Sequence, residues 1–96
     1  MSTARILYLE GCPYCEGARR ALGELVQENP EYGKLEIEWV EEEENPEISE
    51  QYDYYYVPTV FYGDRKLYEA DPSQEYEDIK AKVKEALDYI AEEERL

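Results

Sequence analysis

Residues 4–15, ARILYLEGCPYC, decide how the rest of this chain is organised. The run from residue 4 to 10 is apolar over most of its length, which is typical of a central strand covered on both faces. Cys12 and Cys15 follow, and they are the only two cysteines among 96 residues. Pro13 stands between them, at a position where the first turn of a helix tolerates a missing N–H. The stretch therefore predicts a strand, then a thiol pair, then a helix.

The position of the two thiols at the start of a helix affects their chemical reactivity. The first turn of a helix has unpaired backbone N–H groups and the positive end of the helix dipole, so an anion is stabilised there. We therefore expect Cys12 to be the thiolate of the pair. Cys15 lies three residues later on the same helix face, within reach of disulfide geometry after modest adjustment. The alternative is that both cysteines are buried packing groups without chemistry.

Composition limits the classes of partner. The net charge is −15, from 25 acidic and 10 basic residues, and the chain has no histidine. Long-range repulsion makes nucleic acid and an anionic membrane poor partners, whereas basic protein surfaces are better ones. Residues 1–96 suffice for a single domain with one core. A disulfide across C-x-x-C would constrain the unfolded chain little, and no apolar run is long enough for a signal peptide or a bilayer span. We expect a soluble, cytoplasmic protein with mostly reduced thiols.

The first half of the chain has the pattern of a βαβ unit. Apolar residues recur at helical spacing over 13–28, and Asn29-Pro30 ends that helix. Residues 34–41, KLEIEWVE, alternate as a strand with one wet face, so this strand is expected to lie parallel to the first. The acidic run 41–44 is interpreted as a solvated strand end. Asn45-Pro46 then predicts the cap and first turn of a short helix.

The second half has the pattern of a hairpin followed by a helix. Two alternating segments, 59–62 and 65–69, flank Gly63-Asp64, which is a glycine-first turn signal. Residues 71–74, DPSQ, read as a helix cap, and a helical stripe continues to near the end of the chain. The element order is β-α-β-α-β-β-α. It predicts an α/β domain with a four-stranded mixed sheet, helices on both faces, and the cysteines at the carboxyl end of the first strand.

With these motifs in place, the chain resembles a glutaredoxin of the thioredoxin superfamily. Cys12-Pro13-Tyr14-Cys15 matches the family's dithiol tetrapeptide, and Val57-Pro58-Thr59-Val60-Phe61 is similar to its cis-proline segment. The resemblance covers the whole chain in element order and implies a thioredoxin-like fold. It also implies that Cys12 is the nucleophile, that Cys15 is the resolving thiol, and that Val57 and Pro58 form a backbone platform for the substrate.

The resemblance implies further binding residues around this pair. Tyr14 is expected either to line the substrate groove or to be an exposed aromatic residue beside the cysteines. Where the family has a Gly-Gly step before an acidic residue, this chain has Glu69-Ala70-Asp71. Asp71 and Ser73 are therefore candidates for binding the γ-glutamyl end of glutathione, and Gln51 is a candidate for its glycine carboxylate.

The resemblance implies a thiol–disulfide oxidoreductase that reduces protein disulfides or glutathione mixed disulfides through Cys12 and Cys15. Glutathione is then a possible co-substrate, and a flavoprotein reductase is an alternative source of electrons. We expect a monomer with no bound cofactor or metal, because zinc needs about four ligands and the chain offers two thiolates. The alternative function is a non-catalytic scaffold with the same fold, or a dimeric iron–sulfur cluster binder.

The sequence allows two interpretations for a pair of arginines and two for a group of four tyrosines. Arg19 and Arg20 either stabilise the Cys12 thiolate or bind a substrate carboxylate, or they balance glutamates on the helix face. The tyrosines at positions 52, 54, 55 and 56 form either a recognition surface or ordinary packing with solvated hydroxyls.

Overall fold

The computed structural model describes residues 3–95, which form one four-stranded mixed sheet with helices on both faces. The strands are β1 (Ala4–Tyr8), β2 (Ile37–Glu41), β3 (Thr59–Tyr62) and β4 (Arg65–Glu69). The helices are α1 (Pro13–Glu28), the 3-10 helix η1 (Pro30–Lys34), α2 (Pro46–Ser49) and α3 (Tyr76–Glu94). The predicted α/β class, element order and mixed sheet are confirmed.

The sheet order is β2-β1-β3-β4, so the first strand lies inside the sheet as expected. β1 pairs parallel with β2 and antiparallel with β3, and β3 pairs antiparallel with β4. The register of β3 and β4 shifts between Val60 and Phe61. The hairpin turns at Gly63, whose φ of 63° is the positive value that a glycine-first turn requires.

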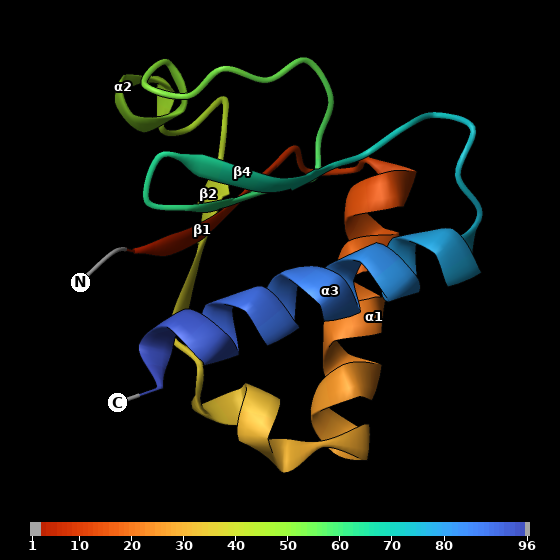
Figure 1. Cartoon of the computed structure of the whole chain (residues 1–96). Helices are drawn as coiled ribbons and strands as arrows, with labels where there is room; N and C mark the ends of the chain where they lie inside the picture. The colour runs from red at the N-terminus through yellow and green to blue at the C-terminus, as the bar shows by residue number, and fades with distance from the viewer. Residues whose placement is uncertain (1–2, 96) are drawn as a thin grey trace.

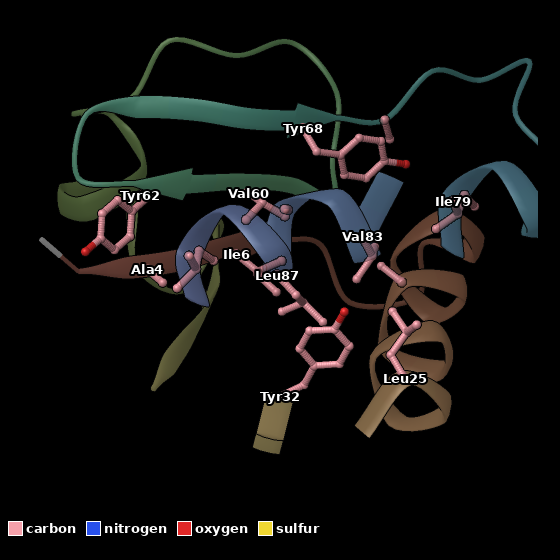
Figure 2. Packing of buried hydrophobic residues seen from close by; sticks show 14 residues of the cluster. Ala4, Ile6, Leu25, Tyr32, Val60, Tyr62, Tyr68, Ile79, Val83 and Leu87 are labelled. Carbon is pink, nitrogen blue, oxygen red and sulfur yellow. The ribbon is translucent and has the colours of Figure 1, made fainter. Parts of the chain in front are cut away.

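The larger core lies between the sheet and the pair α1 and α3, which cover the same face (Figure 1). Ile6 and Val60 project from the sheet toward Leu87 of α3, and Leu25 and Val83 join α1 to α3 (Figure 2). These side chains are at most 3% exposed. The helical stripes read from the sequence therefore point inward, as predicted.

The opposite face has a smaller core, because α2 is only four residues long. Leu7, Val40 and Phe61 are buried there, and Ile48 and Tyr52 pack against them. Figure 1 shows α2 and the loop that follows it on this side of the sheet. One face is thus covered by two long helices and the other by a short helix and a loop.

Two strands are shorter than the sequence pattern predicts. β1 ends at Tyr8 rather than at residue 10, because Cys12 N–H donates to the Leu9 carbonyl (3.2 Å) and closes a turn through Gly11. β2 begins at Ile37 rather than at residue 34, because the chain first forms η1 and buries Tyr32. A hydrogen-bonded turn thus replaces the last residues predicted for β1, and the 3-10 helix takes the first residue predicted for β2.

The last helix begins later than predicted. Residues 71–74 form a turn of their own, in which the Gln74 side chain accepts from Asp71 N–H (3.1 Å). α3 begins at Tyr76, after a reciprocal capping box between Glu75 and Asp78. The predicted cap was wrong because this second box, four residues further on, pairs the backbone N–H groups of Glu75 and Asp78 and so begins the helix there.

The acidic run is also not uniformly solvated. Glu41 is 6% exposed, whereas Glu43 and Glu44 are exposed. Asn45 occupies the cap position of α2, but its side chain donates to the Glu41 carbonyl (3.1 Å) and does not cap the helix. The expectation of a solvated strand end is therefore wrong for Glu41.

Candidate functional site

The chain turns sharply between β1 and α1 and so places Cys12 at the start of the helix. Gly11 has a φ of 83°, a value that other residues rarely adopt, and Pro13 occupies the first helical position. Cys12 is the cap residue of α1, with extended backbone angles. Its side chain makes no capping hydrogen bond to the helix. A thiolate at Cys12 would thus be stabilised by the free N–H groups and the dipole at the start of α1 together, and not by one capping hydrogen bond.

The two thiols differ in their surroundings. Both are free, but Cys12 is half-buried, whereas Cys15 is 4% exposed. Burial raises the pKa of the Cys15 thiol to about 12; the Leu9 N–H, 3.5 Å from its sulfur, opposes this rise, and the neighbouring Cys12 side chain adds to it. At neutral pH Cys15 is therefore a neutral thiol, while Cys12 is the one that solvent reaches.

The segment before β3 lies directly against Cys12. The Val57–Pro58 peptide bond is cis, as the resemblance implies, and the Cys12 thiol donates to the Val57 carbonyl at a sulfur–oxygen distance of 3.9 Å. Pro58 is buried and Val57 is half-buried. The structure thus brings Cys12, Cys15, Val57 and Pro58 together, although Val57 follows Cys12 by 45 positions.

Tyr14 joins α1 to the loop before α3. Its hydroxyl donates to the Pro72 carbonyl at 2.6 Å, and its ring is half-buried against the core. The loop that contains Pro72 is therefore held beside the start of α1. Tyr14 is therefore not an unattached surface ring, and the cavity that it lines, of about 360 Å³, contains neither cysteine.

The remaining predicted binding residues are placed differently from one another. Asp71 accepts from both the backbone N–H and the hydroxyl of Ser73 (2.9 Å each), and these bonds hold the pKa of Asp71 below its ordinary value. Asp71 lines an open cavity of about 360 Å³ together with Tyr55 and Tyr56. Gln51 donates to the Glu47 carbonyl and lines a separate cavity, whose lining includes neither cysteine.

The four tyrosines before the cis peptide bond divide into two pairs. Tyr52 and Tyr54 pack against Phe61, with ring centroids 4.5 Å and 6.4 Å away. Tyr55 and Tyr56 are 88% and 52% exposed. The packing interpretation is thus confirmed for the first pair, and the second pair forms an aromatic surface next to Val57.

Sequence reasoning missed two glutamates that fix the loops of the site. The Glu41 carboxylate accepts three backbone N–H groups, from Glu10 (3.0 Å), Glu43 (2.6 Å) and Glu44 (3.0 Å), and these bonds hold its pKa below the ordinary value. Glu41 thereby holds the loop that precedes Cys12.

The second of these is Glu69, which accepts from the backbone N–H groups of Tyr55 and Tyr56 and so holds the segment that precedes Val57. No local signal in the sequence distinguishes either glutamate from its acidic neighbours, because the amides they bind lie 13 to 31 positions away or in the adjacent turn.

The two adjacent arginines of α1 have different surroundings. Arg20 forms an ion pair with Glu24 (3.3 Å), which agrees with the charge-balancing interpretation. Arg19 instead places its guanidinium over the rings of Trp39 and Tyr8. It also lines a cavity of about 230 Å³ with both cysteines.

Comparison with known proteins adds no family to this geometry. A scan against protein-family models finds no match, and a search of curated proteins finds none either. The case for a function therefore stands on the site itself.

Two searches of the described residues concern other kinds of site. Within residues 3–95 no three or more histidine, cysteine, aspartate or glutamate side chains are grouped so as to hold a metal ion. In the same part of the chain no helix is both long enough and apolar enough to pass through a membrane.

Proposed function

We propose that this protein is a thiol–disulfide oxidoreductase of the glutaredoxin type, with a thioredoxin-like fold. The observation that carries the proposal is the contrast between the two thiols. The accessible Cys12 stands at the start of α1 beside the Val57 carbonyl, and the buried Cys15 lies one turn behind it. The four-stranded sheet and the helices on both of its faces are compatible with that fold.

The arrangement supports a two-step reduction. The Cys12 thiolate attacks one sulfur of a disulfide R–S–S–R′; a Cys12–S–S–R bond forms, the S–S bond of the substrate breaks, and R′–S⁻ leaves and takes a proton from water. Cys15 then gives its proton to water and attacks the Cys12 sulfur, which releases R–S⁻. The substrate gains two electrons, and the protein dithiol becomes a disulfide that an external thiol or a flavoprotein reductase reopens.

The protonation state of Cys15 suits the second step. A resolving thiol that is neutral at pH 7 does not compete with Cys12 for the first disulfide, because the thiolate is the nucleophile. Formation of the mixed disulfide removes the Cys12 sulfhydryl beside Cys15, which is one of the groups that raise its pKa. Burial, the largest cause of the raised pKa, remains, and Cys15 attacks only after the first bond has formed because the Cys12 sulfur is then part of a disulfide.

The substrates that fit this chemistry are protein disulfides and mixed disulfides with glutathione. The exposed rings of Tyr55 and Tyr56, next to the half-buried Val57, offer a surface for an extended peptide beside Cys12. Asp71 and Ser73 bond to one another, which leaves less capacity for a γ-glutamyl group. Glutathione is thus proposed as co-substrate on the strength of the dithiol alone.

The proposal is tested with Cys12→Ser and Cys15→Ser, each checked for folding by circular dichroism. We expect Cys12→Ser to lose all disulfide reduction. We expect Cys15→Ser to keep removing glutathione from a glutathionylated peptide but to stall on a protein disulfide. Intact-mass measurement then detects the trapped Cys12 mixed disulfide. A folded Cys12→Ser variant that still reduces either substrate contradicts the assignment.

A further inference from the structure

The cavity beside the two cysteines is lined by one positively charged side chain, that of Arg19. Cys12 and Cys15 both line this space of about 230 Å³, and its charged side chains are Glu10, Glu16 and Arg19. It lies on the side of the cysteines that faces the loop after β1, whereas the Val57 carbonyl approaches Cys12 from the segment before β3. The cavity therefore offers a substrate a second route to the two cysteines, apart from the surface beside Val57.

Aromatic rings hold the guanidinium of Arg19 in place. Its central carbon lies 4.2 Å from the ring centroid of Trp39 on β2 and 5.2 Å from that of Tyr8 on β1. The two rings pack edge to face, with centroids 5.8 Å apart. An aromatic ring accepts no conventional hydrogen bond, so a guanidinium that lies over rings keeps N–H donors that match both oxygens of a carboxylate.

These donors have no carboxylate partner within residues 3–95, although the chain is rich in glutamate. Arg5, Arg20 and Arg95 each form an ion pair with a glutamate at 2.7–3.3 Å, whereas no ion pair joins Arg19 or Arg65 to another described residue. Of these two unpaired arginines, Arg19 is the one that lines the cavity with both cysteines. The contact of an arginine with an aromatic ring contributes a modest energy. It leaves the five N–H donors of the guanidinium without a hydrogen-bond acceptor. Arg19 is thus an exposed residue that lines the dithiol cavity, and a ligand there would replace water on its donors.

We propose that Arg19 binds a carboxylate of the disulfide substrate, so that the substrate class of this cavity is a low-molecular-weight disulfide with a carboxylate a few bonds from its sulfur. The inference rests on the proposed function, because the substrate sulfur must reach Cys12. A volume of about 230 Å³ admits one half of such a small disulfide rather than a folded protein segment. Glu10 and Glu16 repel a second carboxylate and so limit the site to one.

The chain offers a matched control in Arg20. It carries the same charge on the same helix, so its replacement changes the long-range field almost equally. Its guanidinium is already paired with Glu24 and lies over Tyr76, 4.5 Å from the ring centroid. Arg20 lines a different cavity, which contains neither cysteine.

The test measures the second-order rate constant with which each fully reduced protein is oxidised, from the loss of protein thiols after acid quenching and alkylation. The probes are 3,3′-dithiodipropionate, which carries carboxylates, and 2-hydroxyethyl disulfide, which is uncharged. We expect Arg19→Gln to slow the first reaction about tenfold, the loss of one charge-assisted contact, and the second by less than about twofold. We expect Arg20→Gln to change both by less than about twofold.

Two results would overturn the inference while leaving the proposed function intact. An equal loss for both probes in Arg19→Gln would show that Arg19 acts on the thiols or on the fold. An equal loss for the dicarboxylate in both variants would show that only net charge matters. Failure of the unmodified protein to be oxidised by either disulfide would instead overturn the proposed function, and the inference with it.

Discussion

At the scale of single residues, one buried carboxylate, that of Glu41, holds the loop that precedes Cys12. Glu41 joins the loop after β1 to the turn after β2 through three backbone N–H groups. The amides stabilise the charged form, which is why the pKa of Glu41 lies below its ordinary value of 4.5. The folded protein therefore binds fewer protons here than the unfolded chain below that pH.

This difference in proton binding makes a prediction about acid stability. A depressed pKa in the folded state contributes stability that is fully present above pH 4.5 and is lost as the pH falls through the folded pKa. We expect Glu41→Gln to lower the melting temperature at neutral pH, because an amide side chain cannot accept all three N–H groups. We also expect it to flatten the fall in melting temperature between about pH 6 and about pH 3.

The matched control for Glu41 is Glu43→Gln, since the Glu43 side chain is exposed on the same acidic run. Thermal melts at a series of pH values compare the three proteins. If Glu41→Gln and Glu43→Gln showed the same dependence of melting temperature on pH, the role given to Glu41 would be wrong.

At the scale of elements, the packing of α1 on α3 fixes the helix that carries both thiols. The two helices meet closely at Gly17, where an added Cβ would lie 3.3 Å from Ile79 Cδ1. Gly23, two turns later on the same helix, has no heavy atom within 4 Å of such a Cβ. Gly17 is needed for the close approach of the two helices, whereas Gly23 makes no such contact and only weakens the helix.

This contrast predicts different results for the same substitution at the two glycines. Gly23→Ala should stabilise the protein by about 0.5–1 kcal/mol, because alanine loses less backbone entropy in a helix, and this corresponds to a rise in melting temperature of roughly 2–8 °C. Gly17→Ala should gain less or lose stability, since Ile79 must move. Chemical denaturation of both variants checks the order; a larger gain for Gly17→Ala would refute the packing described at this contact.

Much of the element pattern was predictable, and the reasons are local. The apolar run of β1, the stripe of α1 and the turn at Gly63 follow from side-chain periodicity and from glycine and proline sterics. The end of β1 and the starts of β2 and α3 were not predictable, because each depends on which of several competing turns or caps forms. The placement of Cys12 and Cys15 was predicted because both lie within one local strand-to-helix junction.

At the scale of the whole molecule, a net charge of −15 surrounds a cavity whose own charged side chains are one arginine and two glutamates. This field acts on the encounter with charged substrates and is screened beyond about 8 Å at physiological ionic strength. The Arg19 contact acts at short range, after the substrate has entered the cavity. Measurements at different salt concentrations therefore distinguish the long-range effect of the net charge from the short-range contact of Arg19.

The field predicts opposite salt effects for substrates of opposite charge. Added sodium chloride should raise the rate constant for oxidation by 3,3′-dithiodipropionate and lower that for cystamine, which is a dication, because it weakens repulsion and attraction respectively. Stopped-flow measurements between low and physiological salt check this, with uncharged 2-hydroxyethyl disulfide as the reference. A dicarboxylate rate that falls with salt would mean that local positive charge, rather than the net charge, governs the encounter.

The sequence by itself determined the class of the fold, the order of its elements and the position of the thiol pair, because these depend on periodicity and on sterics within a few residues. Only the tertiary structure decided which acidic residue is buried, which of two adjacent arginines faces the cysteines, and that the Val57 carbonyl lies beside Cys12. Those facts depend on contacts between residues 20 to 45 positions apart, and such contacts form only when the sheet brings its strands together.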